Sequence, residues 1–300
     1  MPPLLQLHLL VLLITSTGIL GRLIQLPPES IVAWRTLIAA MGALTIARGF
    51  RHQPIGLGAR RIAILLGVGA IMGLHWICFF AAIKLANISI CLAGLATISL
   101  FTAFSEPLLT RKPIRPYEVM LGLLVLAGII LIAGFSKGYL AGLMAALAAA
   151  VLASIFPVLN RGLVQQGSDP QVMVGWEMVG AFLITLPLIG FRIATGTGGW
   201  LPTPTDGGWL LILALVCTVF GHAFHIHLLR RITAYQGNLA FNFEPVYGIL
   251  AAGFLFGEWH DLHPGFYAGA LTIIGANLLH PWLEKRQRRP LSEPSAPSSP

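Results

Sequence analysis

Long apolar stretches separated by short polar segments constrain this chain more than any other feature of its sequence. About 20 consecutive apolar residues can cross the hydrocarbon core of a bilayer as a helix. Only 10% of the residues are charged, whereas soluble domains carry roughly 25%. Because the stretches lack the period-2 alternation of a membrane barrel, we predict an all-α integral membrane protein with ten transmembrane helices. The ten stretches are 4–21, 30–48, 62–82, 88–108, 117–135, 139–159, 171–191, 209–229, 234–256 and 265–282.

The Lys and Arg residues are distributed unevenly between the two sides that ten helices would create. With the N-terminus in the cytoplasm, 14 of the 19 fall in cytoplasmic segments and four in outside loops, while Arg35 lies within a helix. Cytoplasmic loops carry such an excess in membrane proteins. We therefore expect a multi-pass protein of the bacterial inner membrane with both termini in the cytoplasm. The net charge of +8 then reflects topology and contact with anionic lipid, and it does not indicate binding to nucleic acid.

Repeated sequence features indicate that the chain consists of two related halves. The segment from Gly122 to Gly128 recurs from Gly269 to Gly275, and the Trp-Arg pair at 34–35 matches the Trp-Glu pair at 176–177. Each half would contain five helices, an odd number, so the second half must enter the membrane in the opposite sense. Inverted repeats are characteristic of secondary transporters and enclose a central substrate site. We predict a first repeat over 1–136, a second over 137–283, and a disordered cytoplasmic tail over 284–300.

Glu244 is the acidic residue most clearly inside the predicted membrane region. It lies 13 residues beyond Arg231, which places it about 20 Å into a core about 30 Å thick. Asn242 lies close to it, shares a helix face with Asn238, and Pro245 removes a backbone hydrogen bond there. We predict that Glu244 and Asn242 bind substrate, because carboxylates inside membranes are usually functional. The alternative is a protonated Glu244 that is hydrogen-bonded to a neighbouring helix.

Two histidines, His75 and His222, are also predicted near the middle of the membrane. Phe79 lies one turn from His75 and faces the same way, while Trp76 occupies an adjacent face. We predict that His75, Trp76, Phe79 and His222 contact substrate, with proton sensing as a role open to either histidine. The alternative is that the histidines only hydrogen-bond packed helices to one another. No H-E-x-x-H motif occurs, so we expect no metal and no cofactor.

Arg35 and Glu177 occupy matching positions of the two halves and carry opposite charges. In an inverted arrangement the two residues lie near opposite ends of their helices, so we expect them at different depths and out of contact. Each side chain can extend towards its own interface. The sequence therefore favours structural or gate-flanking roles for both residues.

Two long segments resemble a known family of membrane proteins. HWICFFAAIKLANISICLAGLATISLFTAFSEPLL, which begins at His75, is similar to the third and fourth helices of the EamA family in the drug/metabolite transporter superfamily. FEPVYGILAAGFLFGEWHDLHPGFYAGALTIIGANLL is similar to the final two helices, with Pro245 and Glu258 at motif positions. The first half departs from the pattern at Ser99, where a proline is usual, and at Lys112, where a glutamate is usual.

The resemblance implies ten helices in two inverted five-helix repeats around a central cavity, with the termini in the cytoplasm. It implies a cavity lined mainly by the first, third, fourth, sixth, eighth and ninth helices. It also implies export of small metabolites, and among characterised relatives the chain resembles YddG-type amino-acid exporters.

We therefore expect a secondary transporter, not an enzyme, that exports amino acids or related small metabolites by alternating access. A phosphate-binding GxxxxGK[ST] loop is absent from the sequence, which argues against ATP hydrolysis by this chain. The expected partners are a small-molecule substrate and the lipid bilayer, with protons as an open addition. A membrane-embedded enzyme and a passive channel or receptor for small metabolites remain the alternatives.

Overall fold

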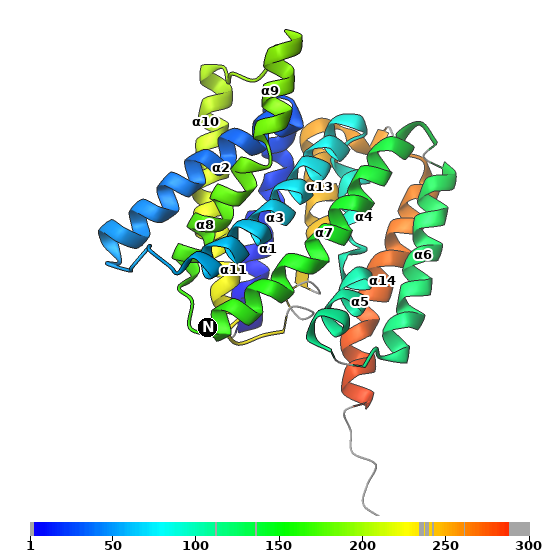
Figure 1. Ribbon diagram of the computed structural model, residues 1–300. Coiled ribbons are helices and arrows are strands. Elements are labelled where there is room, and N and C mark those ends of the chain that lie inside the picture. The colour runs from blue at the N-terminus through cyan, green and yellow to red at the C-terminus, as the bar shows by residue number, and fades with distance from the viewer. Residues whose placement is uncertain are drawn as a thin grey trace, which may run out of the picture.

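The computed structural model describes residues 3–111, 113–135, 137–233, 237, 240–241, 243–260 and 262–287, and these residues form a helical bundle without strands (Figure 1). The first half contains α1 (Pro3–Leu23), α2 (Pro28–Thr45), η1 (Ile46–Phe50), α3 (Ala59–Leu85), α4 (Ile88–Leu95), α5 (Ile98–Thr110) and α6 (Pro116–Phe135). The second half contains η2 (Lys137–Tyr139), α7 (Leu140–Gln165), α8 (Pro170–Leu183), α9 (Leu186–Thr195), α10 (Pro204–Ile212), η3 (Leu213–Phe220), α11 (Gly221–Leu228), α13 (Glu244–Phe256), η4 (Glu258–His260) and α14 (Pro264–Gln287).

Each of the ten predicted membrane helices overlaps a helical segment of the described residues. Among these residues, seven segments are long and apolar enough to cross a membrane, and three shorter apolar helices lie at the remaining predicted positions. The ninth predicted stretch, 234–256, lies partly outside the described residues, and the helix described there starts only at Glu244. Helix α14 continues to Gln287 and so includes the first residues of the predicted tail.

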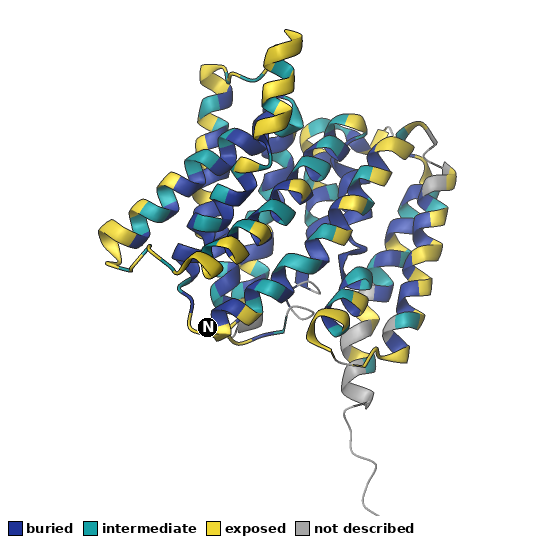
Figure 2. Cartoon of the chain, viewed as in Figure 1, coloured by how far each residue is buried: buried dark blue, intermediate teal, exposed yellow. Residues whose placement is uncertain are grey.

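The outer surface of the bundle is apolar. Large side chains on it are strongly exposed, including Leu108 (81%), Phe254 (75%) and Leu271 (68%). Figure 2 shows exposed residues on the outward sides of the helices and buried residues where the helices face one another. A bundle whose outer face contacts lipid tails requires this distribution, since hydrocarbon offers polar groups no hydrogen bonds.

Glycines allow two pairs of helices to cross at very short range. A Cβ atom on Gly69 of α3 would overlap the backbone carbonyl of Glu177 on α8. A Cβ atom on Gly128 of α6 would lie 2.9 Å from the carbonyl oxygen of Gly269 on α14. Small residues allow such close packing in membrane helices. The first crossing buries Glu177 in the middle of the bundle.

Two of the membrane helices are interrupted near the centre of the bundle. The fourth is divided into α4 and α5 at Thr97, whose hydroxyl donates to the carbonyl oxygen of Gly94 at 2.7 Å. The eighth contains the π-helical η3, where the Thr218 hydroxyl donates to the carbonyl oxygen of Leu213 at 2.8 Å. Short π-helical segments are frequent at functional sites, and both interruptions border a cavity.

Candidate functional site

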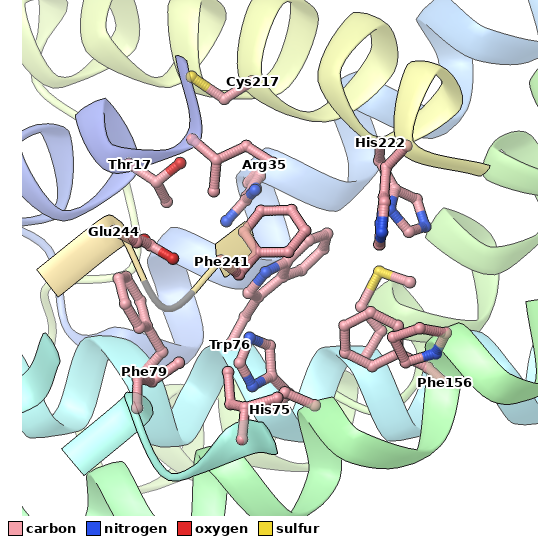
Figure 3. Close-up of a pocket in the computed structure, with 17 residues that line it drawn as sticks. Thr17, Arg35, His75, Trp76, Phe79, Phe156, Cys217, His222, Phe241 and Glu244 are labelled. Carbon is pink, nitrogen blue, oxygen red and sulfur yellow. The ribbon is translucent and has the colours of Figure 1, made fainter. Parts of the chain in front are cut away.

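A central cavity of about 730 Å³, counting its open part, lies between the helices (Figure 3). Side chains from α1, α2, α3, α4, α5, α7, η3, α11 and α13 line it, together with Phe241. The six helices implied by the resemblance all contribute to the wall, and α2 adds Arg35.

Five of the six predicted substrate-binding residues line this one cavity. They are His75, Trp76 and Phe79 on α3, His222 on α11 and Glu244 on α13. The sixth, Asn242, lies outside the described residues. Figure 3 shows Glu244 and His222 on opposite sides of the cavity. The structure thus brings together polar residues that are far apart in the sequence, while their role in binding stays a prediction.

Glu244 supplies a carboxylate at the start of α13. Pro245 occupies the first turn, so the helix begins here instead of kinking midway along a longer helix. The side chain of Glu244 is only 7% exposed, and none of the hydrogen bonds between described residues involves its carboxylate. A buried carboxylate without a polar partner is energetically unfavourable, and a polar ligand in the cavity would supply the missing contacts.

Arg35 reaches into the cavity, which corrects the expectation that it extends to an interface. It is 3% exposed, its Nε donates to the Thr218 hydroxyl at 2.7 Å, and its guanidinium lies 3.7 Å from the ring centroid of Trp76. Its terminal Nη1 has no hydrogen-bond partner among the described residues. Stacking on an indole face stabilises a buried guanidinium. Arg35 is therefore held by Thr218 and Trp76, and its Nη1 group is left without a protein acceptor among the described residues.

Glu177 is likewise buried, not directed to an interface. It is 0% exposed, and its Oε2 accepts hydrogen bonds from His222 Nε2 at 2.9 Å and from Asn160 Nδ2 at 3.3 Å. Its side chain is directed to α7 and α11 by these two hydrogen bonds, while α3 packs against its backbone at Gly69. As expected, the ion pairs of the described residues do not join Arg35 to Glu177.

The histidines of the cavity have different surroundings. His75 Nδ1 donates to the carbonyl oxygen of Ala149 at 2.8 Å, and its ring lies 5.6 Å from that of Phe156. His222 contacts Glu177 directly, whereas His225 packs on Phe241 at 5.0 Å and its Nε2 has no partner among the described residues. In both His75 and His222, one ring nitrogen is held by a hydrogen bond, and the residue forms part of the cavity wall.

The wall residues that the sequence interpretation did not predict as binding residues include Arg35, Phe156 and Phe241. A buried charge within a membrane helix is a functional signal by default, and this rule would have identified Arg35. The aromatic residues gave no comparable signal, because an apolar residue in a membrane helix can face lipid, a neighbouring helix or a cavity. Within the described ranges, His, Cys, Asp and Glu form no group of three or more that could hold a metal ion.

Residues 1–134 and 140–280 each match the EamA-like transporter family. The chain belongs to this family. The two separate matches cover the two halves of the EamA-like chain. Comparison with curated proteins gave no match.

A solved structure described as "Crystal structure of protein" has a similar fold. It aligns with a TM-score of 0.69 at 18% sequence identity, over 95% of this chain and 99% of the other. At this level of sequence identity, the structural similarity establishes the fold and nothing more. The EamA-like transporter family and the fold therefore indicate a membrane transporter with a small-molecule substrate.

Proposed function

We propose that this EamA-like protein exports amino acids or related small metabolites across the bacterial inner membrane as a secondary transporter. The observation that carries the proposal is the presence of one guanidinium, Arg35, and one carboxylate, Glu244, in a buried and largely aromatic cavity. A zwitterion with an apolar side chain complements this cavity. Its carboxylate binds Arg35 and its ammonium group binds Glu244, so each buried charge gains a charged partner.

The aromatic residues complete the proposed site. Phe79 and Phe241 contact the apolar side chain of the substrate, while Trp76 carries the Arg35 guanidinium on its face and so orients it. His75 and His222 donate or accept further hydrogen bonds. Asn242 stays in the proposal as a polar residue close to Glu244 in the sequence.

We further propose that transport proceeds by alternating access between two inverted repeats, 1–136 and 137–283. Ion pairs at the two ends of the second and seventh membrane helices support this arrangement. Glu29, in the first turn of α2, pairs with Arg192 in the last turn of α9. Arg51, just beyond η1, pairs at 3.1 Å with Asp169, the N-cap of α8. The start of each helix thus meets the end of the other, as an antiparallel pair requires.

The hydrogen bonds of two tryptophans also support the arrangement of two inverted repeats. The indole of Trp34 on α2 donates to the carbonyl oxygen of Trp200 at 2.7 Å, in the loop that follows α9. The indole of Trp176 on α8 donates to the carbonyl oxygen of Ile55 at 2.9 Å, in the loop that follows η1. Each half therefore contacts the corresponding loop of the other half, which is the pattern of a two-fold pseudosymmetric pair.

Counterflow in proteoliposomes tests the proposed function. Labelled L-amino acids should enter faster when the same unlabelled amino acid is inside, because a carrier exchanges substrates and a passive channel does not. Glu244→Gln should abolish this exchange. The control is Glu106→Gln, which changes a buried glutamate of α5 that does not line the cavity. Wild-type exchange by Glu244→Gln, or no exchange of any L-amino acid by the wild-type protein, would refute the proposal.

A further inference from the structure

The pair formed by Glu177 and His222 differs from every other polar contact of the cavity. Glu177 is inaccessible to a ligand, since it is 0% exposed, whereas His222 lines the cavity and contacts Glu177 at 2.9 Å. Asn160, which does not titrate, holds Oε2 from the other side. The second oxygen of Glu177, Oε1, is buried without a hydrogen-bond partner among the described residues. The pair therefore combines a sealed carboxylate with an imidazole that faces the cavity.

One proton decides whether this buried pair is neutral. With Glu177 ionised and His222 neutral, Nε2–H donates to Oε2 and the pair carries a charge of −1. One added proton, bound at His222 Nδ1 or at Glu177 Oε1, makes the pair neutral as an imidazolium–carboxylate or imidazole–carboxyl pair. A net charge in a low-dielectric interior is costly unless an opposite charge compensates it.

We propose that Glu177 and His222 form the binding site for a coupling proton, an inference that rests on the proposed transport function. A ligand cannot touch Glu177, but a proton can reach it through His222. The site is therefore separate from the ligand contacts at Arg35 and Glu244, yet the shared cavity links the two sites. Release of this proton when a substrate occupies the shared cavity, and its return when the cavity is empty, would couple one proton to each substrate.

The other titratable groups that line the cavity come from α2, α3, η3, α11 and α13. Arg35 on α2 and Glu244 on α13 carry opposite charges, which largely offset each other. His75 on α3, His225 on α11 and the Cys217 thiol on η3 are the remaining groups. His225 lies 6.4 Å from His222 between ring centroids and has an unpartnered Nε2 within the described part of the chain. It extends the route of the proton along α11.

The first test needs no substrate. Difference infrared spectra of the purified full-length protein, recorded between mildly alkaline and mildly acidic buffer, should contain carboxyl and imidazole bands from the pair. Glu177→Gln should remove this signal, because a Gln carbonyl can accept both hydrogen bonds of Oε2 but does not titrate. Glu106→Gln should leave the signal unchanged. His222→Gln serves as the second variant if Glu177→Gln does not purify, and it should remove the signal as well. Spectra of the variant identical to those of the wild type would overturn the proposal.

The second test uses proteoliposomes and a transported L-amino acid. A pH gradient should drive wild-type accumulation of the amino acid, while Glu177→Gln should lose this accumulation and keep counterflow. A merely structural role of Glu177 would reduce both activities together, and that outcome contradicts the proposal. Wild-type exchange without any effect of the pH gradient also contradicts it. If no amino acid is exchanged at all, the proposed function fails, and the infrared test still decides whether the pair binds a proton.

Discussion

Arg35 and Glu177 occupy matching positions in the two halves of the chain but have different surroundings. Each follows a tryptophan whose indole donates to a loop of the opposite half. The contacts of their own side chains differ. Arg35 enters the cavity with an unpartnered Nη1, whereas Glu177 is enclosed by His222 and Asn160 and is separated from the cavity.

The comparison shows that the backbone position of a residue in each half and the surroundings of its side chain are determined by different contacts. The helix pair and its end contacts place both residues deep in the bundle. The neighbouring side chains then differ: Thr218 and Trp76 hold Arg35 in the cavity wall, while His222 and Asn160 enclose the carboxylate of Glu177. Arg35 therefore lines the cavity, whereas Glu177 is enclosed by protein side chains.

The largest effect should follow from Arg35→Gln. Loss of a buried charged contact to the substrate carboxylate should weaken amino-acid binding by about 100-fold, or roughly 3 kcal/mol. Stability should change little, because Arg35 makes one hydrogen bond to the described residues and its burial is itself unfavourable. Binding is measured by calorimetry and folding by thermal unfolding in detergent. If Arg35→Gln lowered stability as strongly as it weakened binding, Arg35 would have the same structural role that is expected for Glu177.

Replacing Glu177 by Ala should mainly affect stability. The change leaves His222 Nε2 and Asn160 Nδ2 without their acceptor in the bundle interior, which should lower the free energy of unfolding by about 3 kcal/mol. Glu177→Gln is the matched control, since it keeps an acceptor, and it should lose much less. Denaturant titration in detergent compares the two variants, and similar losses would mean that the hydrogen bonds contribute little.

The two tryptophans give a sharper test of the symmetry. Trp34→Phe and Trp176→Phe each remove one indole hydrogen bond to a loop carbonyl, so each should lower the free energy of unfolding by about 1 kcal/mol. Thermal unfolding of both variants under the same conditions provides the comparison. A loss confined to one variant would show that the two contacts are not energetically equivalent.

The smallest effects are expected at the ends of the antiparallel helix pair. Arg51→Gln and Arg192→Gln each break an ion pair with a partly exposed partner, and each should lower the free energy of unfolding by less than about 1 kcal/mol. Arg192→Gln should have the larger effect, since the Arg192 side chain is 26% exposed and that of Arg51 is 47% exposed. Unfolding measured at low and high salt checks this order, because salt should reduce both effects.

Depth estimated along single helices was sufficient for Glu244, His75 and His222 but misleading for Arg35 and Glu177. A polar residue in the middle of a membrane helix has to face the interior of the bundle, so the first three residues meet in one cavity. Arg35 and Glu177 lie nearer to the ends of their helices, where a long side chain can extend to an interface. Whether it does so depends on neighbouring helices, and here α3 and η3 supply the contacts that keep both residues inside.

The sequence alone determined the number and position of the membrane helices, because hydrophobic length is a local property and lipid tolerates only backbones whose hydrogen bonds are satisfied. It also determined the family, through motifs that lie within single helices. Only the tertiary structure decided that Glu177 contacts His222 and that Arg35 lies on Trp76. These contacts join helices that are distant along the chain, and helix crossings at residues such as Gly69 set their geometry, which no local pattern specifies.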